Sequence, residues 1–337
     1  MLLTTDLFLI GLGLALGYGF TPVAIRFANA WGLLDIPEGS LKIHTHPTPR
    51  SGGVALIVGF LCVTALAFIL DRPLLNLQEL TIAILLFGLG FWDDRDSRSP
   101  RLRMILQVLI YSLGFILNVH ISLGAPQIVE FMVGLIVFVA VINGMNFYDG
   151  ADGLLTLTAI GGLGVWAAIA LSAGAAVLPY LVFVALLVGF MPANWHPARI
   201  FLGDGGSFLV GFFFYLVMVR SSGADLGFLA GSWVCALPVC DAIAATVDRI
   251  LRHRNVWEGD RDHVYDIMAR LGFSTPQVAI TLALVAAVCA RSAAWIAVQN
   301  EPARWLLTIG IYVVLAVGIF VLRRRFGETP VATADNI

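Results

Sequence analysis

The residues from Asn143 to Leu154, NGMNFYDGADGL, carry the polar side chains best suited to chemistry in this chain. Asn143 and Asn146 are three positions apart and would share one face of a helix, and Asp149 and Asp152 repeat that spacing. A glycine after each aspartate would break the helix and let backbone approach a ligand. Such oxygen ligands suit Mg²⁺, with Mn²⁺ as the alternative, better than zinc. Capping of the next helix would explain Asp152 alone.

A second polar stretch, FLGDGGSF, places Asp204 among three glycines directly before an apolar run. Backbone N–H groups at a helix start favour anions such as phosphate, and a carboxylate among them would add a cation that phosphate can share. An ordinary turn has a similar composition, so this interpretation depends on the neighbouring motifs.

Two adjacent acids, Asp93 and Asp94, follow the third apolar run, where hydrocarbon gives way to water. Carboxylates at membrane depth are costly, and they are therefore candidates for function, although one acid can simply mark a helix end. Basic residues such as Lys42 and Arg50 accompany the acids in other hydrophilic stretches. Acids, cations and glycine turns together fit phosphoryl transfer. Topology alone is the competing explanation for the arginines.

The composition indicates that helices in a bilayer must position these groups. The chain is 59% hydrophobic and 12% charged, and its mean hydropathy is +0.90, whereas a soluble domain carries about 25% charged residues. The net charge of −2 gives no support for nucleic acid as a partner. The four cysteines lie in apolar runs and show neither a disulfide framework nor a zinc spacing.

Eleven apolar segments recur along the chain and predict an all-α polytopic membrane protein. We expect one integral-membrane domain over residues 1–325 and a polar tail over 326–337. The segments cover residues 7–30, 52–70, 78–92, 104–120, 126–142, 153–171, 176–193, 206–220, 226–246, 277–298 and 304–322.

The distribution of basic residues predicts the orientation, because cytoplasmic loops carry an excess of lysine and arginine. Sixteen of the 20 basic residues fall on one side, which places the N-terminus outside and the C-terminus inside. The predicted cytoplasmic loops cover residues 31–51, 93–103, 143–152, 194–205 and 247–276 and contain all the polar motifs. We therefore expect an active site that opens to the cytoplasm.

In chain order, these motifs resemble the polyprenyl-phosphate N-acetylhexosamine-1-phosphate transferases, which include the bacterial enzymes that start O-antigen and teichoic acid linkage synthesis. KIHTHPTPRSGG is similar to the first cytoplasmic loop of the family, and DDRDSRSPRLRMILQ to its aspartate-rich second loop. NGMNFYDGADGL matches the pattern Asn-x-x-Asn-x-x-Asp-Gly-x-Asp-Gly, and FLGDGGSFLVG matches Gly-Asp-x-Gly-Ser.

The fifth loop departs from the family pattern Asp-Arg-x-His-x-His-His. The sequence DRDHVYDIMARLGFS keeps Asp260, Arg261 and His263, but Tyr265 and Asp266 replace the second and third histidines. Since the family uses this loop to recognise the sugar nucleotide, the departure leaves the identity of the sugar open more than the reaction.

The resemblance implies transfer of a sugar 1-phosphate from UDP-N-acetylhexosamine to undecaprenyl (polyprenyl) phosphate, with release of UMP. It also implies Mg²⁺ dependence, location in the cell inner membrane and a homodimer. The implied roles are catalytic for Asp93, Asp94 and Asp152, substrate-binding for Lys42, His44, Arg50, Asn143, Asp149, Arg261 and His263, and metal-binding for Asn146 and Asp204.

Two other functions compete with this one. Broken membrane helices with acids also build transporters, but those place polar groups near the midplane in paired halves. Another Mg²⁺-dependent membrane phosphotransferase, acting on CDP-alcohols, would need an aspartate-glycine pattern that is not evident in this sequence. For the transferase itself, direct attack by the lipid phosphate and a route through a phospho-aspartate both remain open.

Overall fold

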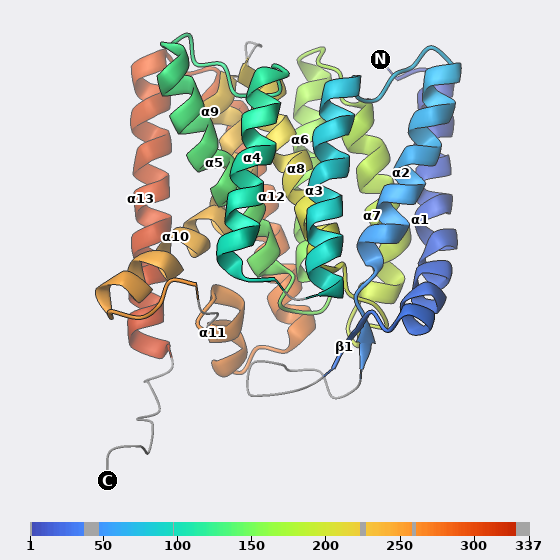
Figure 1. The fold of residues 1–337 in the computed structure, drawn as a ribbon. Coiled ribbons are helices and arrows are strands. Elements are labelled where there is room, and N and C mark those ends of the chain that lie inside the picture. Colours follow the sequence, from blue (N-terminus) through green and yellow to red (C-terminus); the bar gives the residue numbers. More distant parts are fainter. Residues whose placement is uncertain (1, 37–46, 97, 223–226, 258–260, 328–337) are drawn as a thin grey trace.

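The structure is a computed structural model that describes residues 2–36, 47–96, 98–222, 227–257 and 261–327. In this part of the chain it is a bundle of helices with one short two-stranded sheet (Figure 1). The helices are α1 Thr4–Trp31, α2 Gly52–Ile69, α3 Leu77–Arg95, α4 Pro100–Ile116, α5 Gln127–Tyr148, α6 Leu154–Ser172, α7 Leu178–Asn194, α8 Gly203–Ser222, α9 Gly227–Ser232, α10 Ala236–Leu251, α11 Val264–Arg270, α12 Thr275–Ala297 and α13 Glu301–Phe326. The strands are β1 Leu34–Asp35 and β2 Thr48–Pro49, which pair antiparallel.

The predicted all-α polytopic membrane fold is confirmed. Each of the eleven apolar segments coincides with a helix, and the ninth consists of α9, a 3₁₀ turn over Trp233–Cys235 and α10. Among the described residues, eight helical segments are long and apolar enough to cross a bilayer by themselves. The helices α3, α4 and α7 are not among these eight, and α4 and α7 have only 17 residues each.

The helices alternate in direction, so the motif-bearing connections gather at one end of the bundle. In Figure 1 the ends of α3, α5 and α7 and the starts of α4, α6 and α8 lie at the lower end, where α13 also ends. The start of α1 lies at the opposite end. The fold therefore brings the polar stretches together, while the assignment of this end to the cytoplasm stays a prediction.

Helix α8 forms the centre of the bundle, and 83% of its apolar stretch is buried, a share that among the described candidate spans only the segment Gly227–Leu251 equals. It packs against α2, α3, α5 and α9. Phe213 of α8 stacks on Phe183 of α7, with ring centroids 3.8 Å apart, and meets Phe60 of α2 edge-on at 5.1 Å. Close aromatic packing of this kind fixes the position of α8, whose first turn carries Asp204.

Two glycines allow α2 and α3 to approach the start of α8 at backbone distance. A methyl group at Gly90 of α3 would overlap the backbone of Asp204, and one at Gly53 of α2 would overlap Gly206. The segment before α8 is tied to the same region, because Gly53 N–H donates to the Leu202 carbonyl at 2.8 Å. These contacts hold the Gly-Asp-Gly-Gly turn against two neighbouring helices.

Candidate active site

A cavity of about 1030 Å³ lies at the motif-bearing end of the bundle, between α4, α5, α8 and α10. Of the twelve predicted site residues, two, Lys42 and His44, lie outside the described residues. Within the described part of the chain, Asp93 and Arg261 are not in the cavity lining. The other eight line the cavity: Arg50, Asp94, Asn143, Asn146, Asp149, Asp152, Asp204 and His263.

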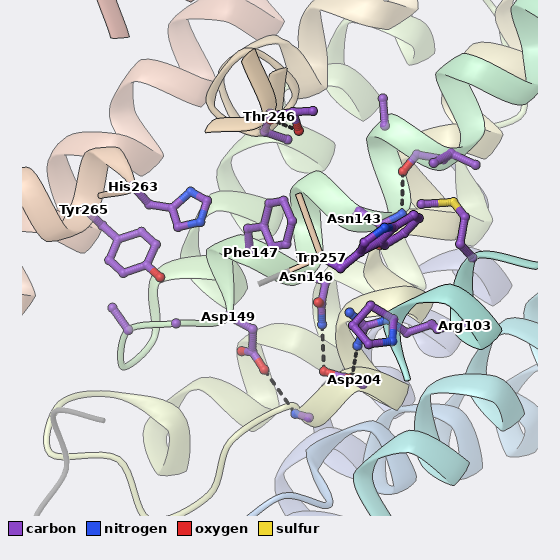
Figure 2. Close-up of a pocket in the computed structure, with 18 of the residues that line it drawn as sticks. Arg103, Asn143, Asn146, Phe147, Asp149, Asp204, Thr246, Trp257, His263 and Tyr265 are labelled. Carbon is purple, nitrogen blue, oxygen red and sulfur yellow. Dashed lines mark hydrogen bonds and ion pairs between the residues drawn. The ribbon is translucent and has the colours of Figure 1, made fainter. Parts of the chain in front are cut away.

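Asp204 is held by side chains from two other helices (Figure 2). One carboxylate oxygen accepts a hydrogen bond from Asn146 Nδ2 at 2.7 Å, and the other accepts one from the Arg103 guanidinium at 3.1 Å. The same guanidinium nitrogen donates to Asp93 at 2.8 Å. Arg103 therefore links α3, α4 and α8, and the contacts of Asp93 are those of a residue that orients Arg103.

Arg103 is a functional candidate that the sequence did not single out. It was one of many arginines on the predicted cytoplasmic side, and nothing in its spacing distinguished it from Arg101 or Arg98. Its contact with Asp204 joins residues 101 positions apart, which only the packing of α4 against the bundle determines.

The first backbone N–H groups of α8 donate to carboxylates. Asp94 accepts from Asp204 N–H at 2.8 Å and from Gly205 N–H at 2.9 Å, and Asp149 accepts from Gly203 N–H at 3.1 Å. A carboxylate at a helix N-terminus is a favourable arrangement. The expectation that these N–H groups bind phosphate is therefore wrong for this structure, because protein side chains already use them.

Negative charge is concentrated at this end of the cavity. Burial and the nearby carboxylates of Asp204 and Asp94 hold the pKa of Asp149 well above its usual range. The nearby cations are fewer than the carboxylates, since Arg103 is shared by Asp93 and Asp204, and Arg50 pairs with Asp35 at 2.7 Å. A site with this excess of carboxylates favours binding of a cation.

The donor set is sparse but fits a hard divalent cation. Among the residues that the structure describes, no three His, Cys, Asp or Glu side chains are grouped so that they could hold a metal ion. Mg²⁺, however, is usually held by one or two protein ligands together with water and substrate phosphate. Asp204 and Asn146, in contact at 2.7 Å, supply such a pair, because rotation of the Asn146 amide exchanges its nitrogen for its oxygen.

The remaining residues of the Asn143–Leu154 motif also have defined partners. Asn143 Nδ2 donates to Gln107 Oε1 of α4 at 2.7 Å. The Asp152 carboxylate contacts His196 Nδ1 at 2.7 Å and accepts from Ala198 N–H at 3.1 Å. Helix capping as an explanation for Asp152 is therefore wrong: Gly153 is the N-cap of α6, and no side chain caps it.

The fifth loop places His263 and Tyr265 in the cavity wall, whereas Arg261 is not part of the lining. Arg261 pairs with Asp266 at 3.1 Å, and both residues belong to the stretch that departs from the family pattern. The Tyr265 hydroxyl lies so close to Gly150 that a side chain at position 150 would overlap it. The tyrosine thus connects this loop to the glycine-broken turn between α5 and α6.

The other half of the cavity is apolar. This apolar wall runs from the acidic end along the helices α4, α5 and α10. Its lining side chains are Met104, Val108, Leu135, Ile136, Val139, Ala140, Ala242, Ile243 and Val247.

Comparison with known proteins identifies relatives of this chain. Residues 77–222 match the family described as Glycosyl transferase family 4. An undecaprenyl-phosphate alpha-N-acetylglucosaminyl 1-phosphate transferase of Haemophilus influenzae is 31% identical over 334 residues, covering 90% of this chain and 91% of that protein. The chain belongs to the polyprenyl-phosphate N-acetylhexosamine-1-phosphate transferase family.

Other members of the transferase family are similar over comparable lengths. A probable undecaprenyl-phosphate N-acetylglucosaminyl 1-phosphate transferase of Bacillus subtilis is 26% identical, covering 88% of this chain and 85% of that protein. A decaprenyl-phosphate N-acetylglucosaminephosphotransferase of Mycobacterium tuberculosis is also 26% identical, covering 96% and 90%. The segment matched by the glycosyltransferase family contains Arg103, Asn146 and Asp204, whereas His263 lies beyond its end.

Proposed function

We propose that this chain transfers N-acetylhexosamine 1-phosphate from a UDP-sugar to undecaprenyl (polyprenyl) phosphate, releasing UMP. The product is the diphosphate-linked lipid that starts synthesis of a cell-surface polysaccharide. One observation carries the proposal: a single cavity joins an acidic end around Asp204 to an apolar wall formed by α4, α5 and α10. A lipid phosphate has the matching two parts, a charged head and a hydrocarbon chain.

The residues support direct attack by the acceptor. An oxygen of the lipid phosphate forms a bond to the sugar-bearing phosphorus of the donor, and the bond from that phosphorus to UMP breaks with its electron pair on UMP. The second pKa of a phosphate monoester is about 6, so the attacking oxygen is already ionised near neutral pH. Both oxygens of Asp94 accept N–H groups of α8, which makes this carboxylate a poor nucleophile for a phospho-aspartate route.

Asp204 and Asn146 would hold Mg²⁺, or Mn²⁺ as the alternative. When bound there, the ion would supply positive charge to the diphosphate of the donor and to the departing UMP. Arg103 keeps the Asp204 carboxylate in place from the side of α4. We further propose that the site faces the cytoplasm across the inner membrane, and we keep the homodimer as an expectation from the family.

An assay of UMP release tests the proposal. Purified protein with undecaprenyl phosphate, Mg²⁺ and a panel of UDP-N-acetylhexosamines should release UMP with one or more of the donors. Release of UMP should not occur without the lipid phosphate. It should also stop after chelation with EDTA and resume when Mg²⁺ is added back. Uptake of a solute into proteoliposomes without UMP release would support a transporter, and turnover of a CDP-alcohol would support the other phosphotransferase class.

Ala140→Trp tests the apolar wall as the place of the lipid chain. The added indole would fill part of the wall between α4, α5 and α10, so we expect the KM for undecaprenyl phosphate to rise about tenfold, equivalent to about 1.4 kcal/mol of lost burial. The KM for the UDP-sugar should not change. Ala65→Trp on the exposed side of α2 is the matched control. An equal rise in both KM values would place the lipid elsewhere.

A further inference from the structure

A carboxylate outside the family motifs lies fully buried in α10. Asp241 is 0% exposed, and within the described part of the chain its carboxylate makes two polar contacts, both with the fifth loop. One oxygen lies 2.8 Å from His263 Nδ1, and the other accepts from Val264 N–H at 3.3 Å. Because burial of a carboxylate within a membrane helix costs several kcal/mol when it lacks partners, these contacts are what allow Asp241 to lie there.

The two contacts of Asp241 have different consequences. The bond to Val264 N–H secures the first turn of α11, of which His263 is the N-cap residue. The contact with Nδ1 acts on the imidazole itself. An ionised carboxylate only accepts hydrogen bonds, so opposite an ionised Asp241 the Nδ1 atom carries the hydrogen.

Aromatic packing adds to the fixed orientation of the imidazole. The ring of Phe147, from the end of α5, lies 5.0 Å from His263 between centroids, and Tyr265 lies nearly parallel to the imidazole at 5.7 Å. Figure 2 shows His263 and Tyr265 on the opposite side of the cavity from Arg103. His263 is 4% exposed and lines the cavity, and its Nδ1 is the nitrogen that faces Asp241.

We propose that Asp241 is a positioning residue that fixes the tautomer and orientation of His263 and so aims the imidazole into the cavity. A carboxylate that orients the far nitrogen of a functional histidine is a recurrent device in enzymes. Helix α10 then serves both substrates, because Ala242 and Ile243 belong to the apolar wall. That His263 contacts the UDP-sugar rests on the proposed function, whereas the positioning of its ring does not.

The first test needs no substrate. Protein with isotopically labelled histidine nitrogens, in detergent, should give an NMR signal for His263 typical of a ring that carries hydrogen on Nδ1. Loss of this signal in His263→Gln assigns it. In Asp241→Asn the His263 signal should no longer be typical of a ring with hydrogen on Nδ1, because an amide can also donate to Nδ1. A His263 signal in the wild-type protein with hydrogen on Nε2 alone would overturn the proposal, even if no Asp241 variant folds.

The second test is a double-mutant cycle. Asn at position 241 keeps an oxygen for Val264 N–H, so a purely structural role predicts little loss. Positioning predicts that Asp241→Asn lowers kcat/KM for the UDP-sugar by about 10- to 100-fold, with the KM for the lipid phosphate unchanged. Adding Asp241→Asn to His263→Ala should cause no further loss. Additive losses would show that Asp241 acts separately from the histidine.

The control is a similar carboxylate away from the cavity. Glu130 is 8% exposed, accepts from Leu123 N–H at 2.7 Å and faces His120 at 3.7 Å. Glu130→Gln should leave kcat/KM unchanged, and an equal loss there would reduce the effect at Asp241 to general damage. If the wild-type chain releases no UMP from any donor, the proposed function fails, and the NMR test alone decides the positioning.

Discussion

Asp204→Asn is expected to reduce UMP release by at least about a thousandfold while the protein stays folded. Asp204 is one of the two residues proposed to hold Mg²⁺, and the charge that a metal supplies in a transition state is worth several kcal/mol, or about tenfold per 1.4 kcal/mol. Asn146→Ala should remove turnover in the same way. The measurement is UMP release at saturating donor and acceptor.

The Asp204→Asn variant should not lose stability. Asp204 lies in a cluster of carboxylates whose mutual repulsion contributes to the raised pKa of Asp149. Removal of one of these charges reduces the electrostatic repulsion that destabilises the folded state. Its thermal unfolding midpoint in detergent should match or exceed that of the wild type. Asp96→Asn removes an exposed carboxylate at the same end of the bundle and is the matched control. Turnover at the wild-type rate in Asp204→Asn would refute the site assignment.

Gly90→Ala is expected to lower both stability and turnover. The added methyl would overlap the backbone of Asp204, which cannot move away as a flexible side chain could. Overpacking of this kind costs about 1–3 kcal/mol. A displacement of about 1 Å at the start of α8 would also misplace Asp204, and misplacement on that scale can cost about a hundredfold in rate. Thermal unfolding and UMP release measure the two effects.

Gly88→Ala is the control within the same helix. A methyl at Gly88 would meet nothing within 4 Å, and the two positions share the same gain in helix propensity, about 1 kcal/mol. Gly88→Ala should therefore be neutral or stabilising and fully active. Equal behaviour of the two variants would mean that contact between α3 and α8 does not position the site.

Much of the fold followed from the sequence because membrane helices have a strong local signal. A bilayer requires long apolar runs, and all eleven such runs coincide with helices. The break between Tyr148 and Leu154 was predictable from the glycines around Asp149 and Asp152. Eight of the predicted site residues line the cavity. Short motifs and charged clusters in the sequence indicated seven of them, and the family resemblance added His263.

Contacts between distant segments were not predictable. Both oxygens of Asp94 accept N–H groups of α8, a contact that its position after the third apolar run did not predict. Arg103 had the same residue type as its neighbours, and Asp241 was a lone acid inside an apolar run. Their partners lie 101 and 22 positions away, and one sequence carries no signal for such pairs.

The sequence by itself determined that this chain is a helical membrane protein and which polar residue types its motifs offer for chemistry, because hydrophobic length and motif spacing are local properties. Only the tertiary structure decided what each polar group contacts. Gly90 lets Asp204 lie against α3, Arg103 reaches Asp204 from α4, and Asp241 holds His263 from α10. These relations depend on how helices pack side by side, and packing joins residues by distance in space and not by position along the chain.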